Sequence, residues 1–189
     1  MTAGRNVILV PGALADGSGW QGVQDELAAA GLRVHVARIP MSPAGDVALT
    51  RRLLDGLDGP AVLVGHCYGG VVITEAGTHP RVASLVYLAA FVPDQGESID
   101  TLVAAGPALP VPARGATVTD PAWRHRPSWY LVALQDRIIA PALQRGMAER
   151  AGSIVVEVVG SHAVHVTQPA AAADLIREAA AAVFGPAAP

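Results

Sequence analysis

Short apolar runs alternate with segments of helical spacing along the chain, and this rhythm most limits how the chain can fold. The runs are largely apolar at every position, which is typical of strands buried on both faces of a parallel sheet. We therefore expect an α/β fold, a parallel six-stranded sheet with helices on both faces. The expected strands are 7–10, 33–39, 61–65, 82–90, 128–134 and 154–159. The expected helices are 19–30, 46–57, one from just after 65 to about 78, 141–151 and 169–184.

Residues 94–127 interrupt this rhythm, because they are rich in Pro and Gly and allow at most one short helix near 98–105. We interpret them as a short lid or loop insertion in a single domain that spans 1–189. Right-handed crossovers place the carboxyl ends of all the strands at one edge of a parallel sheet, where ligands bind. The insertion is expected to lie above that edge.

Composition excludes several classes of function. The net charge of −3 comes without a basic stripe, which argues against a nucleic-acid partner. The sequence contains no lysine, so Schiff-base chemistry is excluded, and its one cysteine cannot form an intrachain disulfide. No apolar run is long enough to cross a membrane, and the first residues lack the pattern of a secretory signal. A cytoplasmic location without a membrane partner is therefore expected.

The strongest local motif is Gly-His-Cys-Tyr-Gly at 65–69, between an expected strand and an expected helix. It matches G-x-S-x-G with Cys67 in place of serine. This spacing suits a very tight strand-to-helix turn, in which glycines at 65 and 69 avoid collisions and the central residue projects above the sheet. The start of the following helix would lower the thiol pKa and offer backbone N–H groups to an oxyanion.

Two further residues complete a nucleophile, acid and histidine in the chain order that this motif requires. Asp136 follows the strand expected at 128–134, and His162 follows the strand expected at 154–159. Three such residues, each at the carboxyl end of a strand, predict a catalytic triad and therefore an enzyme. Asp94 is an alternative acid, because it follows the fourth strand, and His165 is expected to flank the site.

The chain resembles the α/β-hydrolase superfamily over nearly its whole length, in particular small bacterial esterase-like members. The segments that carry the resemblance are VILVPGALADGSGW, VLVGHCYGG, YLAAFVPDQGES, PSWYLVALQDRIIAP and GSHAVHVTQP. The resemblance implies a minimal α/β-hydrolase fold in which Cys67 is the nucleophile, His162 the general base and then acid, and Asp136 the residue that orients His162. It also implies an oxyanion hole formed by the backbone N–H groups of Ala13 and Tyr68.

Two positions depart from the pattern of that superfamily. Pro11 stands where its members usually have histidine before the glycine of the oxyanion loop. Cys67 stands where most have serine, and the sequence does not decide between a natural thiol enzyme and a Ser→Cys substitution. The thiol predicts a hydrolase or acyltransferase that acts on ester, lactone or thioester carbonyls of small molecules through an acyl-enzyme on Cys67.

Four further residues are candidates for substrate binding: Asp16, Ser18, Trp20 and His66. Asp16 and Ser18 have helix capping as an alternative, and Trp20 has core packing. No metal site and no cofactor are expected, because the histidines are scattered and no C-x-x-C motif occurs. The sequence does not predict the oligomeric state.

Two other classes of function stay open as alternatives. Gly17–Gly22 matches G-x-G-x-x-G, which is typical of an NADP-binding reductase with Arg38 as the phosphate partner. The match is imperfect, since the first glycine does not directly follow the strand. The other alternative is a non-catalytic or lyase member of the same fold, because fold alone does not determine function.

Overall fold

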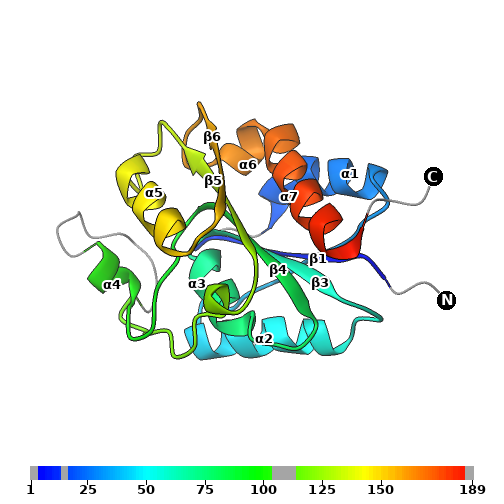
Figure 1. Ribbon diagram of the computed structural model, residues 1–189, viewed down its shortest axis with the longest axis horizontal. Coiled ribbons are helices and arrows are strands. Elements are labelled where there is room, and N and C mark those ends of the chain that lie inside the picture. Colours follow the sequence, from blue (N-terminus) through cyan, green and yellow to red (C-terminus); the bar gives the residue numbers. More distant parts are fainter. Residues whose placement is uncertain (1–3, 14–16, 104–113, 186–189) are drawn as a thin grey trace.

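The computed structural model describes residues 4–13, 17–103 and 114–185. Its six strands form one sheet in which every pairing is parallel, in the order β2-β1-β3-β4-β5-β6 (Figure 1). The strands are β1 (Asn6–Val10), β2 (Arg33–Val36), β3 (Ala61–Cys67), β4 (Val82–Ala90), β5 (Ser128–Ala133) and β6 (Ile154–Val158). From β1 the chain adds β2 on one side and β3 to β6 on the other, so the direction of strand addition reverses between β1 and β3. In such sheets ligands bind at the carboxyl ends of the strands on either side of this point.

Helices cover both faces of this sheet, as the alternation of the sequence predicts. One apolar layer packs against α2 (Pro43–Asp55), α3 (Gly69–Ala76) and α5 (Pro141–Arg150). The opposite layer packs against α1 (Gln21–Ala29) and α7 (Pro169–Phe184), which lie side by side in Figure 1. The described residues also form two short helices, α4 (Ile99–Leu102) and α6 (Val164–Thr167). Two 3₁₀ turns lie at Ser18–Trp20 and Ala122–Arg124.

The predicted α/β fold is confirmed, and two expectations within it are wrong. The strand expected at 33–39 ends at Val36, and the edge strands β2 and β6 are not buried on both faces. Every residue of β6 except Val158 is exposed. An edge strand has a neighbour on one side only, and no run of sequence shows which strand takes the edge.

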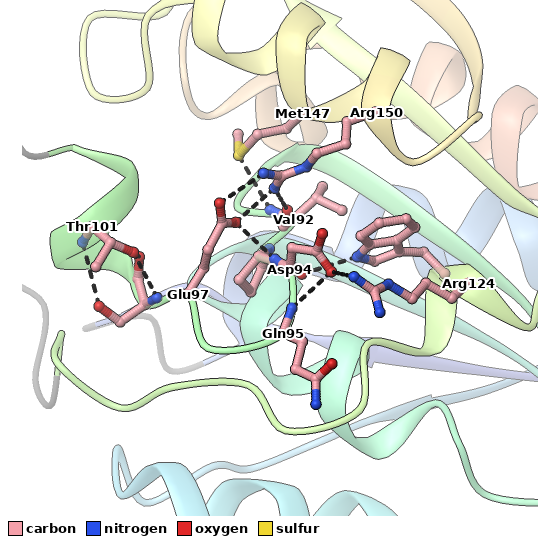
Figure 2. Close-up of polar contacts among 11 residues, drawn as sticks. Val92, Asp94, Gln95, Glu97, Thr101, Arg124, Met147 and Arg150 are labelled. Atoms are coloured by element: carbon pink, nitrogen blue, oxygen red, sulfur yellow. Dashed lines mark hydrogen bonds and ion pairs between the residues drawn. The ribbon is translucent and has the colours of Figure 1, made fainter.

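The described part of 94–127 is held against the rest of the chain. Arg150 on α5 donates to both carboxylate oxygens of Glu97 at 2.7 Å each and to the carbonyl of Val92 at 2.8 Å (Figure 2). Ser98 caps α4 through a reciprocal pair of hydrogen bonds with Thr101. The role of this segment as a lid remains a prediction. No helix in the described residues has the length and apolar character needed to span a membrane.

Candidate functional site

Cys67 lies at a strained corner between β3 and α3. Its φ of 53° is in the left-handed region, which residues with a Cβ seldom adopt. The corner is possible because glycines surround it: a Cβ on Gly65 would lie 2.6 Å from the carbonyl oxygen of Gly69, and one on Gly69 would collide with the backbone of Val10. The expectation that side chains at 65 and 69 would clash is confirmed. Cys67 is 6% exposed and carries a free thiol.

His162 and Asp136 meet at the carboxyl ends of β6 and β5. The Nδ1 atom of His162 lies 2.7 Å from Oδ2 of Asp136, and His162 and Cys67 line one cavity. The sheet therefore brings together Cys67, Asp136 and His162, the three residues predicted from the sequence to form a triad. Because an ionised carboxylate only accepts hydrogen bonds, Nδ1 of His162 carries a proton. The other ring nitrogen, Nε2, is then the one available to exchange a proton with Cys67.

Opposing influences act on the charge of His162. Burial disfavours the imidazolium, but the hydrogen bonds to Asp136 and Cys67 and their negative charges favour it, and together they raise the pKa of His162 to about 9. The ring therefore holds a proton at neutral pH. A protonated imidazole beside a thiol stabilises the thiolate, the nucleophilic form of cysteine.

A cavity of about 480 Å³ opens in front of Cys67, and its wall includes His162. Gly12 brings the loop after β1 very close, because a Cβ there would lie 2.9 Å from the Cβ of Cys67. Ala13 lines the same cavity, and Tyr68 directly follows Cys67 in the chain. The backbone groups expected to form an oxyanion hole are therefore close to the thiol.

His66 and His165 also line this cavity, and both are buried. Nε2 of His66 lies 2.9 Å from the carbonyl oxygen of His162 and must donate, since a carbonyl only accepts. Burial and the charges of the neighbouring histidines lower the pKa of His66 well below its ordinary value. Burial and the charge of His162 lower the pKa of His165 to about 4. At neutral pH, His162 is therefore the only charged imidazole of the three.

The expected substrate-binding residues have different positions. Ser18 and His66 line the cavity, whereas Trp20 is 1% exposed and its ring packs 4.5 Å from that of His165. Trp20 is therefore a core residue, the alternative that its sequence position left open. Asp16 lies outside the described residues.

Asp94 is excluded as the triad acid by its contacts. Figure 2 shows its carboxylate paired with Arg124, at 2.5 Å, and accepting from the backbone of Gln95 at 2.7 Å. His162 is paired with Asp136 instead.

Gln144, a fully buried residue of α5 that hydrogen-bonds to Asp136, was not predicted from the sequence. Its Nε2 donates to Oδ2 of Asp136 at 2.8 Å and to the carbonyl of Ile139 at 2.7 Å, while its Oε1 accepts from the backbone of Ala133 at 3.1 Å. The other carboxylate oxygen accepts from the backbone N–H groups of Ile138 and Ile139. The only sequence signal for Gln144 is one polar residue on the buried face of a helix.

Packing explains two of the three glycines of the 17–22 motif. A Cβ on Gly22 would lie 2.9 Å from Pro169 of α7, and one on Gly19 would lie 3.1 Å from Val166 of α6. Gly19 and Gly22 thus let the segment approach α6 and α7 closely, so close packing accounts for them without a dinucleotide. Among the described residues, no group of three His, Cys, Asp or Glu side chains is arranged to hold a metal ion.

Comparisons with known proteins agree with this architecture. The model of a family described as the alpha/beta hydrolase family matches residues 7–118 and 95–175. A carbendazim hydrolyzing esterase from a Nocardioides species is 52% identical over 44 residues, 22% of this chain and 18% of that protein. A pyrethroid hydrolase from Sphingobium wenxiniae is 32% identical over 115 residues, 53% of this chain and 41% of that protein. Both matches thus span less than half of the curated relative.

Solved structures share the fold. A pyrethroid hydrolase from Sphingobium faniae superposes with a TM-score of 0.83 at 22% identity, covering 94% of this chain and 97% of that one. Polyneuridine aldehyde esterase superposes with a TM-score of 0.79 at 15% identity, covering 93% and 98% respectively. At these identities the likeness shows the architecture alone.

Proposed function

We propose that this chain, which belongs to the alpha/beta hydrolase family, cleaves small-molecule esters through a covalent acyl-enzyme on Cys67. The observation that carries the proposal is the Asp136–His162 hydrogen bond, with His162 and Cys67 together at the wall of one cavity and Cys67 among the groups that raise the pKa of His162. The names of two relatives, a carbendazim hydrolyzing esterase and a pyrethroid hydrolase, support small esters as the substrate class.

The first half of the reaction is acylation. The thiolate of Cys67 attacks the ester carbonyl carbon, and the negative charge that develops on the oxygen is stabilised by the backbone N–H groups of Tyr68 and Ala13. Each such donor contributes about 3–4 kcal/mol to the transition state. His162 gives its proton to the leaving alcohol as the carbon–oxygen bond breaks. A thioester on Cys67 and a neutral His162 remain.

Deacylation reverses the role of His162. The neutral ring takes a proton from water, the oxygen of that water attacks the thioester, and the carboxylic acid leaves as the Cys67 thiolate is restored. Asp136 keeps Nδ1 protonated throughout, so the other nitrogen stays available to the reacting groups. Amines and thiols attack thioesters more readily than water does, so transfer of the acyl group to such an acceptor belongs to the same proposal.

The test is acid-quenched intact-mass spectrometry together with turnover of a panel of p-nitrophenyl esters of increasing acyl length. We expect either an acyl mass increase located on Cys67 or steady turnover, and loss of both in Cys67→Ala. His162→Gln should slow acylation by at least a hundredfold, whereas His125→Gln, at an exposed histidine paired with Asp120, should change it less than twofold. Turnover that survives in Cys67→Ala, or a panel that yields neither adduct nor product, would contradict the proposal.

A further inference from the structure

A second cavity, of about 570 Å³, lies between α2, α3 and residues 116–118. In the described part of the chain it shares no lining residue with the cavity at Cys67. Its wall is mostly apolar, and its charged residues in that part of the chain are Arg51 of α2 and Glu75 of α3. This second cavity is called the α2/α3 cleft below. It is of the size of many small-molecule sites, which range from about 300 to 1,000 Å³.

The α2/α3 cleft runs along the two helices. Ala44, Val47 and Arg51 follow one another on one face of α2, at the spacing of successive helical turns. Arg51 lies seven positions after Ala44, which corresponds to about 10 Å along the helix axis. Val71 and Val72 of α3 form the facing apolar wall. A ligand that lies along this cleft would therefore meet hydrocarbon over most of its length and a cation at one end.

Arg51 is fixed in place and keeps unused hydrogen-bonding capacity. Its Nη2 donates to the carbonyl of Glu75 at 2.8 Å and to the hydroxyl of Thr78 at 3.2 Å. Among the described residues, its Nε and Nη1 have no hydrogen-bond partner, and no carboxylate lies within ion-pair distance of the guanidinium. A guanidinium that makes no ion pair and keeps free N–H groups can bind a carboxylate ligand with two parallel hydrogen bonds.

Two carboxylates of α2 and α3, those of Asp46 and Glu75, are hydrogen-bonded to groups other than Arg51. Glu75 lines the cleft, but its two oxygens accept from the backbone N–H of Thr119 at 2.8 Å and from the Thr119 hydroxyl at 2.5 Å. Asp46 is fully buried in α2 and accepts from the hydroxyl of Tyr68 at 2.8 Å. Both carboxylates keep their negative charge, but among the described residues neither forms an ion pair with Arg51.

We propose that the α2/α3 cleft binds an apolar carboxylate, with its carboxylate on Arg51 and its hydrocarbon between Val47 and Val71. The apolar wall excludes water from the chain of such a ligand, and burial of each CH₂ group is favourable by about 0.8 kcal/mol. The fixed guanidinium selects the anionic head group without the cost of ordering a free side chain. This site goes beyond the proposed ester cleavage and does not depend on it.

The experiment is calorimetric titration of the protein with decanoate and, for comparison, decanol. We expect decanoate to bind with one site per chain and decanol to bind at least tenfold more weakly. Arg51→Gln should weaken decanoate at least tenfold, whereas Arg52→Gln, which removes the same charge from an exposed neighbour, should change it less than twofold. Equal effects of these two variants would attribute the binding to overall charge and overturn the proposal.

Two further measurements locate the ligand. Ala44→Trp places bulk on the wall of the α2/α3 cleft and should abolish binding, while Ala48→Trp, at another exposed position of α2, should not. Alkylation of Cys67 with iodoacetamide should leave decanoate binding unchanged. Loss of binding after alkylation would place decanoate in the cavity at Cys67, and absence of binding to the unmodified protein would also contradict the proposal. Thermal unfolding of each variant verifies that it is folded.

Discussion

At the scale of single residues, the proton on His162 links the chemistry of the site to the stability of the fold. Hydrogen bonds to Asp136 and Cys67 outweigh burial and raise the pKa of His162 from about 6.5 to about 9. The folded state therefore binds this proton more tightly than the unfolded state. The resulting stabilisation is fully present below about pH 6.5 and is lost as the pH rises through about 9.

This linkage predicts a pH-dependent difference between the wild type and His162→Gln. The difference in free energy of unfolding should be largest near pH 6, where it includes about 3 kcal/mol from the shifted pKa, and should shrink by pH 10. Urea unfolding at several pH values measures it. A difference that stays constant from pH 6 to pH 10 would show that the pKa of His162 is not raised in the folded protein.

Gln144 helps to orient Asp136, because its amide donates to one carboxylate oxygen of that residue. Gln144→Leu keeps the approximate volume but leaves the backbone N–H of Ala133 and the carbonyl of Ile139 buried without partners. Buried groups left unsatisfied cost about 1–3 kcal/mol each, so we expect a loss of about 2–5 kcal/mol in urea unfolding. Gln21→Leu, at an exposed amide on α1, is the matched control and should cost less than about 0.5 kcal/mol. Equal losses would show that Gln144 contributes no more than a surface amide.

At the scale of elements, the corner between β3 and α3 depends on the absence of side chains at its glycines. In Gly65→Ala the new methyl group would lie 2.6 Å from the carbonyl oxygen of Gly69, so strand and helix must separate. We expect a loss of more than about 3 kcal/mol or failure to fold. In Gly146→Ala, within α5, nothing lies within 4 Å of the new methyl group, and we expect a gain of about 0.5–1 kcal/mol. Thermal unfolding of both variants checks the contrast, and a stable, folded Gly65→Ala would refute it.

The elements also show which features the sequence could predict. The turn at Cys67 was predictable because its causes are local: an apolar run followed by two glycines with a cysteine midway between them. Asp136 and His162 were predictable because parallel strands end at one edge of the sheet. Gln144 was not, since its role arises from a contact between α5 and a loop that forms only after folding. For Trp20, the sequence left both lining and packing open, and burial beside His165 decides for packing.

At the scale of the whole molecule, the order of the strands separates what the sequence could predict from what it could not. A run such as 154–158 is apolar enough for the centre of a sheet, yet β6 is the edge. Ile154, Val155 and Val156 are 50%, 41% and 37% exposed, and Val159 just beyond them is 65% exposed. The choice of edge depends on how all the crossovers pack together, which no single segment encodes. The consequence is an apolar strand with one unpaired side.

An unpaired apolar edge is prone to pair with another chain, and natural edges often carry lysine, which prevents such pairing. This chain contains no lysine, and the one charged residue of β6, Glu157, is paired with Arg145. We therefore expect self-association that increases with protein concentration, measured by sedimentation velocity. Ile154→Lys should reduce it, because a charge on the edge would have to be buried in any paired sheet.

The matched control for this prediction is Val166→Lys, at an apolar residue of α6 that is as exposed as Ile154, at 51% against 50%, but lies outside the strand. Both variants add the same charge and remove similar apolar area, so they differ mainly in whether the lysine lies on the edge of the sheet. If both reduce association equally, general charge repulsion accounts for the effect. If neither does, the edge of β6 does not drive association. Selective loss in Ile154→Lys is the outcome expected of an edge that pairs strand to strand.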